Sequence, residues 1–401
     1  MARRTRRDGD PRACGGVMME IPITRPHLAG DEGEAVAEAI ASGWISQGPR
    51  VRAFEEAFAA RVGAADAVAT TSCTTALALA LHVSGVGPGD EVIVPSLSFI
   101  ATANAVWHCG ARPVFADIDP RTYNLDPAAA ERAITPATKA IMPVHQLGLP
   151  ADMDAFLELA ERHGVALVED AACAIGARYR DRPIGSLGPL ACFSLHPRKV
   201  ITTGEGGMIA VQDPAVAERL RRLRAHGMDT SDLARHAARD IVVEAYPERG
   251  WNSRMTDMQG ALGLCQLRVL DEILERRRVL AERYTAALAG IPHIEAPYDP
   301  PYAARTWQSY CVRIAANAPI GRTELMRRLL HDGIATRRGV MAIHEEAAYA
   351  ERPAVSGRVG LRHTEAATRE TLMLPLFPDL SEEQQDHVLE RLAASMLALA
   401  A

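Results

Sequence analysis

Lysine is nearly absent from this sequence of 401 residues: only Lys139 and Lys199 occur among its 44 basic residues. Chemistry that needs a lysine amine, such as imine formation with a carbonyl compound, is therefore confined to two positions, because arginine stays protonated. Lys139 lies in a polar turn, where contact with solvent is the simpler interpretation. Lys199 is the stronger candidate, with a surface position in a loop as the competing interpretation.

Other absences narrow the function classes. No run of about 18 uncharged apolar residues occurs, so we expect no membrane helix. The seven cysteines are dispersed, without a C-x-x-C pair or zinc-finger spacing, so we expect no structural metal and a reducing cytoplasm. A net charge of −6 gives no electrostatic reason to expect nucleic-acid binding, and 48% hydrophobic residues exclude a disordered chain.

The N-terminus differs from the rest of the chain. Residues 1–17 contain five arginines and two aspartates and lack apolar periodicity, which predicts a disordered basic tail over residues 1–18. No apolar region follows the arginines, so a secretory signal is not expected. Translation that begins at Met18 or Met19 is the competing explanation for this segment.

The sequence between residues 66 and 211 alternates short β-rich runs with segments of helical period, which predicts an α/β fold. The runs lack strict polar alternation, as is typical of parallel strands covered by helices on both faces. We therefore expect a mostly parallel sheet from seven runs: Ala67–Thr71, Glu91–Pro95, Pro113–Ile118, Ala140–His145, Ala166–Asp170, Cys192–Leu195 and Gly207–Val211.

A proline-free helical pattern extends from about Met255 to Leu288, and the texture changes after Pro292. We expect a large domain over residues 19–265, a connector helix over 266–290 and a small C-terminal α/β domain over 291–401. The small domain is predicted to contain strands at Ser309–Ile314 and Leu372–Leu376 and helices at Arg322–Asp332 and Glu382–Leu399.

Asp170 and Lys199 are the most informative pair. Asp170 ends a buried strand, where a carboxylate points into the crevice in which parallel sheets bind ligands. A lysine on a later loop could reach the same crevice. The two groups are the minimum for Schiff-base chemistry, in which the lysine forms the imine and the carboxylate keeps a pyridine nitrogen protonated.

A hydroxyl-rich turn, Thr70–Ala76, opens a predicted helix and suits a phosphate, although an ordinary serine or threonine cap explains it equally. The glycines of Thr203–Gly207 lack the lysine and hydroxyl of a P-loop and indicate a tight turn beside Lys199. The segment Gly250–Asp257 is interpreted as the start of a helix, with Ser253 or Thr256 as its cap.

Together these segments resemble the pyridoxal 5'-phosphate (PLP)-dependent sugar aminotransferases of the DegT/DnrJ/StrS group, of fold type I. The resemblance extends from about Ile21 to Leu392. Its ordered motifs are Ser42–Pro49, Phe54-Glu55, Pro88–Pro95, Asp117-Ile-Asp119, Val144-His145, Glu169–Ala172, Thr203–Met208, Asn252 and Arg254-Met255.

The resemblance implies a role for individual residues. Lys199 is the catalytic group that binds PLP covalently and moves the proton, and Asp170 pairs with the ring nitrogen. Asn252 reaches the phosphate of the neighbouring subunit, so a homodimer with shared sites is implied. Further contacts with the cofactor are implied for Cys73, Thr74 and Ser194 at the phosphate and for Phe99 stacked on the ring.

Two positions depart from many relatives. Cys173 stands where glutamine or histidine contacts the cofactor, and His196 stands where an aromatic or polar residue is common. Contact with the substrate is considered for His196, Arg254, Arg337 and His344. One branch of the family has histidine in place of the lysine and removes a hydroxyl, so Lys199 favours transamination.

The expected reaction moves an amino group from glutamate or glutamine to C3 or C4 of a nucleotide-linked keto-6-deoxysugar. A keto-cyclitol of the scyllo-inosose type is the alternative acceptor. A PLP-binding non-catalytic regulator and a PLP lyase or decarboxylase are the alternatives from other classes.

Overall fold

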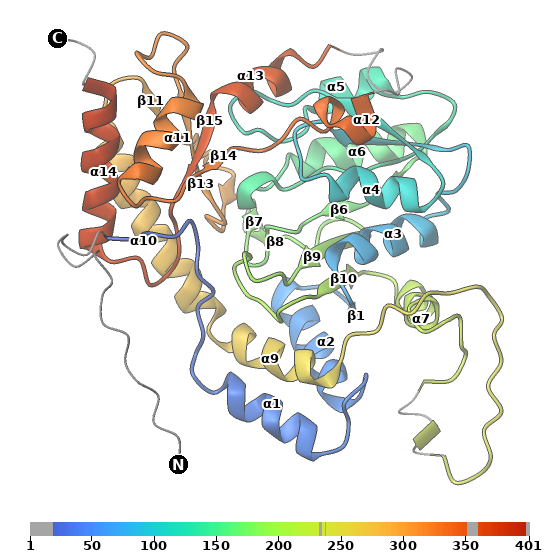
Figure 1. Ribbon diagram of the computed structural model, residues 1–401. Helices are drawn as coiled ribbons and strands as arrows, with labels where there is room; N and C mark the ends of the chain where they lie inside the picture. Colours follow the sequence, from blue (N-terminus) through green and yellow to red (C-terminus); the bar gives the residue numbers. More distant parts are fainter. Residues whose placement is uncertain (1–18, 232–234, 237, 351–359, 398–401) are drawn as a thin grey trace, which may run out of the picture.

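The computed structural model describes residues 19–231, 235–236, 238–350 and 360–397. The predicted basic tail at residues 1–18, with Cys14, lies outside them. Within the described residues a large α/β unit carries the main sheet, and a smaller unit from β11 onward carries a second sheet (Figure 1). None of the described helices combines the length and the apolar character needed to cross a membrane.

The main sheet consists of two four-stranded groups, in the orders β3-β2-β4-β5 and β1-β10-β9-β6. They join because β5 and β6 are consecutive pieces of one run and because Val144 bridges to Asp170 in parallel. With β5 and β6 counted as one, this is the predicted sheet. Its strands are β1 (Asp66–Thr70), β2 (Glu91–Pro95), β3 (Arg112–Ala116), β4 (Thr138–Ile141), β5 (Ala166–Leu167), β6 (Glu169–Asp170), β9 (Leu190–Ser194) and β10 (Gly207–Val211).

All pairings in this sheet are parallel except those of β10, which runs antiparallel to β1 and β9. The carboxyl ends of β2, β4, β6 and β9 therefore meet at one edge. Because β10 runs in the opposite direction, its first residue, Gly207, lies at the same edge. In the register, Gly207 stands opposite Thr70 on one side and Ser194 on the other. This edge is where the fold gathers its polar side chains.

Helices connect and cover the strands. Several begin at side-chain caps: Ser72 caps α3, Asp126 caps α5 and Asp213 caps α7, each accepting a backbone N–H of the first turn. The helices of the large unit are α1 (Glu32–Ala41), α2 (Pro49–Val62), α3 (Cys73–Val83), α4 (Ala101–His108), α5 (Pro127–Ala133), α6 (Met153–His163), α7 (Pro214–Leu223) and α9 (Asp257–Arg268).

The continuous helix expected from Met255 to Leu288 is wrong in one respect, because two helices meet at Val269. Helix α9 ends there and α10 (Leu270–Leu288) begins there, with φ −98° and ψ 7° at Val269. The two helices pack on different partners: α9 lies against α1 and α2, and α10 against α14. The break therefore falls where the packing partner changes.

The C-terminal unit, β11 to α14, is built on an antiparallel sheet in the order β11-β13-β15-β14. Its predicted elements are found, with bounds shifted by a few residues, while the domain limits at 265 and 290 stay a prediction. Its elements are β11 (Ile294–Glu295), β13 (Tyr310–Ile314), α11 (Arg322–His331), β14 (Arg337–Arg338), α12 (Ala347–Ala350), α13 (Arg362–Glu370), β15 (Thr371–Leu374) and α14 (Glu382–Leu397). A short sheet in the order β12-β7-β8 (Ala303–Ala304, Arg178–Tyr179, Arg182–Pro183) pairs a strand that follows β11 with two strands of the large unit.

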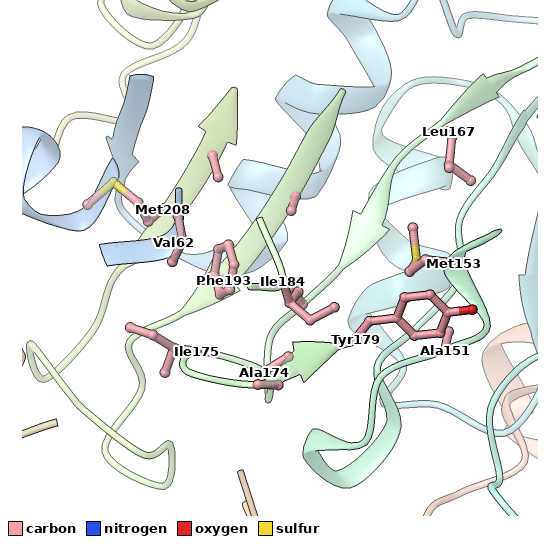
Figure 2. Close-up of a cluster of buried hydrophobic side chains, with 14 of the residues drawn as sticks. Val62, Ala151, Met153, Leu167, Ala174, Ile175, Tyr179, Ile184, Phe193 and Met208 are labelled. Atoms are coloured by element: carbon pink, nitrogen blue, oxygen red, sulfur yellow. The ribbon is translucent and has the colours of Figure 1, made fainter. Parts of the chain in front are cut away.

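Hydrophobic clusters accompany the two sheets, and a smaller one joins Leu97 of the large unit to Cys311 of the C-terminal unit. Two clusters belong to the main sheet and a third, with Tyr284, Tyr310 and Leu325, to the C-terminal unit. Figure 2 shows part of the first cluster, where Phe193 and Met208 of adjacent strands contact Val62 and Ile184. The rigid sheet that results holds the ends of its strands in place.

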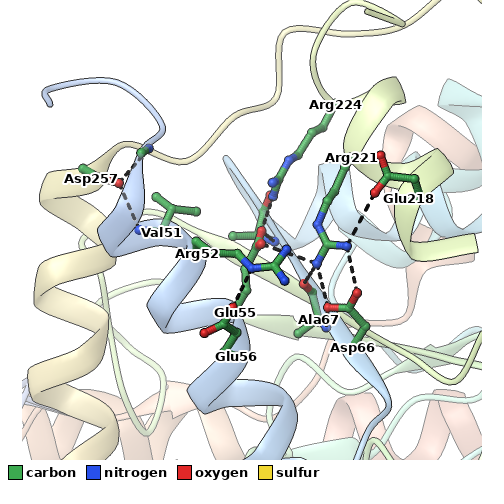
Figure 3. Close-up of polar contacts among 12 residues, drawn as sticks. Val51, Arg52, Glu55, Glu56, Asp66, Ala67, Glu218, Arg221, Arg224 and Asp257 are labelled. Carbon is green, nitrogen blue, oxygen red and sulfur yellow. Dashed lines mark hydrogen bonds and ion pairs between the residues drawn. The ribbon is translucent and has the colours of Figure 1, made fainter. Parts of the chain in front are cut away.

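A buried polar network fixes the first strand of the main sheet (Figure 3). Glu55 of α2 accepts hydrogen bonds from Arg224 and from the Ala69 N–H (2.9 Å), and Arg224 also donates to the Ala69 carbonyl (2.5 Å). Glu55 is 1% and Arg224 2% exposed, so neither charge has water as an alternative partner. Asp257 similarly accepts the N–H groups of Gly48 (2.8 Å) and Val51 (2.9 Å) at the start of α2.

Replacing Glu55 should test this network. Glu55→Ala leaves the Arg224 guanidinium buried without its carboxylate and should lower the free energy of unfolding by about 3–5 kcal/mol. Glu56→Ala is the matched control, because the exposed Glu56–Arg52 pair contributes about 0–1 kcal/mol. Urea unfolding of the two variants measures the difference, and equal losses would contradict the role given to Glu55.

Candidate functional site

Asp170 occupies the centre of the polar edge, at the carboxyl end of β6. Its carboxylate is 4% exposed and accepts hydrogen bonds from the Thr102 hydroxyl at 2.8 Å and the Ala172 N–H at 3.2 Å. Ser98 lies 2.7 Å from Thr102, and since Thr102 donates to Asp170, Ser98 donates to Thr102. This chain of hydroxyls fixes the direction in which Asp170 points.

Burial is the largest influence on Asp170 and raises the pKa of its carboxyl group above the ordinary value. The Thr102 hydroxyl, the Ala172 amide and Lys199 act in the opposite direction without cancelling it. A buried carboxylate with a raised pKa is stabilised by a cation placed next to it. The arrangement thus suits a ligand that presents a protonated nitrogen.

A second buried pair supports the strand from behind. His145 and Glu169 are both fully buried, and His145 Nε2 lies 2.9 Å from Glu169 Oε2. The Ala151 N–H donates to His145 Nδ1 at 3.0 Å, so Nε2 carries the proton and donates to Glu169. The backbone N–H of His145 also donates to the backbone carbonyl of Asp170 at 3.0 Å. The pair therefore anchors the backbone that presents Asp170.

Lys199 lies in the loop after β9, and its Nζ contacts the Cys173 sulfur at 3.1 Å. The predicted pair of Lys199 and Asp170 thus shares one neighbourhood, which also includes Cys73. Burial disfavours the Lys199 ammonium, but Cys173, Cys73 and Asp170 act against it and together raise the pKa of Lys199. Lys199 and Asp170 therefore lie close enough to interact electrostatically.

The hydroxyl-rich turn forms the start of α3, beside these groups. Ser72 caps the helix by accepting the Thr75 N–H, and Cys73 and Thr74 are the first helical residues. Gly207 lies against the turn so closely that a Cβ would be 2.5 Å from the Ser72 carbonyl and 2.7 Å from the Cys73 nitrogen. Helix N–H groups with a positive dipole end, and Ser194 opposite Gly207, provide donors for an anion.

The remaining predicted residues lie in different surroundings. Phe99 is 60% exposed, in the loop between β2 and α4, and Asn252 is exposed in a segment whose next residue, Ser253, accepts the Thr71 N–H at 3.0 Å. His344 comes from the C-terminal unit, and its Nδ1 lies 2.6 Å from the Ser96 hydroxyl at the end of β2. His344 is therefore brought to the polar edge by a contact between the units.

Three further candidates for contact with the substrate are His196, Arg254 and Arg337. His196 is partly exposed and its Nε2 lies 3.9 Å from Glu205; burial lowers the pKa of His196 while Glu205 opposes that effect. Arg254 is partly buried before α9, and Arg337 is exposed on β14. The structure does not bring Arg337 into contact with Asp170 or Lys199 among the described residues.

Sequence reasoning missed the hydroxyls of Ser96, Ser98 and Thr102. Their signal was available in part, since Ser96 and Ser98 directly follow a predicted strand. Thr102 looked like an ordinary helix residue, because its partner Asp170 is 68 positions away.

The comparisons with known proteins agree on one family. The model of the DegT/DnrJ/EryC1/StrS aminotransferase family matches residues 26–393. The spore coat polysaccharide biosynthesis protein SpsC of Bacillus subtilis is 39% identical, over 92% of this chain and 95% of its own. GDP-perosamine synthase of Caulobacter vibrioides is 41% identical, over 93% and 97%.

A solved structure extends the likeness to the fold. Spr1654 of Streptococcus pneumoniae in its PLP form has a TM-score of 0.87 with this chain, at 27% identity, and the match covers 95% of this chain and 99% of that one. The expected PLP fold type I is confirmed by these likenesses, and so is the family.

The hydroxyl chain can be tested through Asp170. Thr102→Val removes a donor from a buried carboxylate and should cost about 1.5–3 kcal/mol of stability. Because the hydroxyl favours the ionised form, its contribution is present above the pKa of Asp170 and lost as the pH falls through that value. The difference in free energy of unfolding between the variant and the natural protein should therefore shrink as the pH of the urea titration is lowered through the pKa of Asp170.

Thr102→Ser is the matched control for this prediction, since it keeps the donor and should restore most of the stability. An equal loss in the serine and valine variants would contradict the hydrogen-bonding role.

Proposed function

Because the chain belongs to the DegT/DnrJ/EryC1/StrS aminotransferase family, we propose that it aminates a nucleotide-linked keto-6-deoxysugar, at C3 or C4, in the cytoplasm. Glutamate or glutamine is the proposed amino donor and PLP the cofactor. The observation that supports this proposal is the meeting of Lys199 and Asp170 at the carboxyl ends of the parallel strands, beside the start of α3.

The residues of the site fit PLP. The cofactor's phosphate suits the N–H groups at the start of α3, where Cys73 and Thr74 lie, together with the Ser194 hydroxyl. The close approach of β10 to this turn depends on Gly207, since a side chain there would collide with the backbone of Ser72 and Cys73. Asp170 would hold the ring nitrogen and Lys199 the carbonyl carbon. When bound, PLP supplies an electron sink for the carbanion formed at the reacting carbon.

Lys199 has two tasks in the proposed reaction. Its Nζ would hold the cofactor's carbonyl carbon and, when free, would take the proton from the α-carbon of the amino donor. The Cys173 sulfur, 3.1 Å from Nζ, holds the released amine in place. In the second half of the reaction the same Nζ moves a proton to the sugar carbon that receives the nitrogen.

Asp170 contributes electrostatics. Its buried carboxylate stabilises a positive charge on the ring nitrogen, and the cation in turn offsets the cost of burying Asp170. The hydroxyl of Thr102, itself held by Ser98, orients the carboxylate and favours its ionised form. This part of the site is built before any substrate arrives, so no reorganisation is needed during the reaction.

The acceptor is assigned from the relatives and from local charge. GDP-perosamine synthase is named for a nucleotide-linked amino sugar, which supports a nucleotide-linked acceptor here. Arg254, Arg337, His196 and His344 are proposed to contact the substrate, and His344 is the one that touches the polar edge through Ser96. A keto-cyclitol stays the alternative acceptor.

A homodimer with shared sites completes the proposal. Residues 238–247, between α7 and α9, project away from the large unit (Figure 1) and expose Ile241 by 89%, Val243 by 84% and Tyr246 by 62%. Phe99 and Asn252, both proposed to contact the cofactor, are exposed as well. A second copy that covers these apolar side chains would also enclose the site.

Lys199→Ala should abolish the visible absorbance of lysine-bound cofactor and lower the amination rate by at least about 10³-fold, because covalent attachment and proton transfer are both lost. Lys139→Ala is the matched control: it removes the only other lysine, which is exposed, and should leave absorbance and rate unchanged. Bound cofactor absorbance and full activity in Lys199→Ala would overturn the central assignment.

Val243→Glu should test the shared site, because a carboxylate in the interface opposes dimerisation. Sedimentation is expected to show a folded monomer with weak PLP binding and less than about one tenth of the activity, as follows from lost positioning. Val279→Glu, at an exposed valine of α10, is the control and should remain dimeric. A fully active Val243→Glu monomer would exclude a shared site.

A further inference from the structure

The segment Thr306–Gln308, which leads into β13, reaches from the C-terminal unit to the backbone on both sides of the Lys199–Cys173 contact. The Thr306 hydroxyl donates to the Cys173 carbonyl at 2.8 Å. Gln308 Nε2 donates to the carbonyl of Arg198, the residue before Lys199, at 2.6 Å. One short segment therefore holds the two loops whose side chains meet at 3.1 Å.

Thr306 is packed tightly against Gly148 and Cys173. The Thr306 N–H donates to the Gly148 carbonyl at 3.1 Å. Gly148 has φ +85°, and a Cβ there would lie 2.0 Å from the Thr306 hydroxyl and 3.0 Å from the Cys173 carbonyl. The close approach of three backbone segments is thus possible only with glycine at this position.

The segment is also held from the side of the C-terminal unit. Trp307 is a buried non-glycine residue with φ +51°, a conformation that the surroundings must impose. Arg277 of α10, 1% exposed, donates to the carbonyls of Trp307 (3.2 Å), Gln308 (3.4 Å) and Leu376 (3.3 Å). The Arg305 guanidinium lies 4.2 Å from the centre of the Trp307 ring.

This arrangement is costly to maintain. Burial lowers the pKa of Arg277 to about 10, and the described structure offers that charge carbonyl groups rather than a carboxylate. A strained tryptophan and a buried arginine thus lie at a segment that touches both loops of the site. Such strain is typical of places where position matters for function.

We propose that Thr306 and Gln308 are positioning residues, a strut through which the C-terminal unit fixes the place of Lys199 Nζ relative to the reacting carbon. The inference rests on the proposed aminotransferase function, in which Nζ must reach more than one atom in turn. A displacement of about 1 Å at a catalytic group can lower a rate about 100-fold, so two hydrogen bonds to the adjacent backbone have a large effect.

Gln308 allows a sharp test, because the Arg198 carbonyl is the partner of its amide nitrogen and its Oε1 has no hydrogen-bond partner among the described residues. Gln308→Met removes this contact and nearly keeps the volume. Gln385→Met is the control: Gln385 is also buried in the C-terminal unit and donates to the Leu280 carbonyl at 2.7 Å, away from the site, while its Oε1 accepts from Arg283 at 3.2 Å.

With PLP bound, the first readout is the single-turnover rate of the absorbance change with saturating glutamate, or with glutamine if glutamate is inactive. Gln308→Met should slow it by about 10- to 100-fold, while Gln385→Met leaves it unchanged. The pH at which the lysine-bound cofactor changes its absorbance should also shift in Gln308→Met alone. Identical behaviour of the two variants in both measurements would overturn the strut.

A second readout separates this inference from the proposed function. In the cofactor-free protein, amide hydrogen exchange over residues 195–200 should be faster in Gln308→Met than in Gln385→Met or the natural protein. If the natural protein gave no absorbance change with either donor, the proposed function would fail. The exchange result would still show whether Gln308 holds the backbone around Lys199. Unchanged exchange over residues 195–200 would refute it.

Thr306 provides an independent variant should Gln308→Met fold poorly. Thr306→Val removes the donor to the Cys173 carbonyl and should slow the single turnover, whereas Thr306→Ser keeps the donor and should restore the rate. Equal rates in the valine and serine variants would count against a positioning role for Thr306.

Discussion

The burial of the Asp170 carboxylate is the constraint around which the site is organised. A carboxylate that is 4% exposed, in the middle of a sheet, is tolerated only with donors close by, and the structure supplies Thr102, Ala172 and the field of Lys199. The His145–Glu169 pair, itself fully buried, fixes the backbone that carries Asp170. The carboxyl group is thus positioned before any ligand binds, and a cationic ring nitrogen beside it would favour its ionised form.

The same edge shows why the proposed cofactor needs no dedicated loop. Parallel strands end together, the start of α3 presents N–H groups, and Gly207 lets β10 lie against that turn. The two ends of PLP would therefore be held by features of the sheet itself. The specificity for the sugar is left to side chains from the loops and from the C-terminal unit, such as His344.

Much of this architecture could be predicted from the sequence, because each strand is marked by a short local run of apolar residues. Two of the seven predicted runs, Glu91–Pro95 and Gly207–Val211, agree with the observed strands at both ends. The run Ala166–Asp170 instead forms two short pieces, and the long helix breaks at Val269. In both cases the pattern of apolar residues was continuous, and the packing partner changed within it.

The sequence by itself determined which groups do the proposed chemistry: with only two lysines, and Asp170 at the end of a strand, the choice of reacting residues was narrow before any contact was known. Only the tertiary structure decided how those groups are held. Thr102 lies 68 residues from Asp170, and Gln308 lies 110 residues from Arg198. Such bonds depend on how distant segments pack, and no spacing along the chain encodes that distance. Local patterns therefore identify the chemistry, whereas long-range packing sets its geometry.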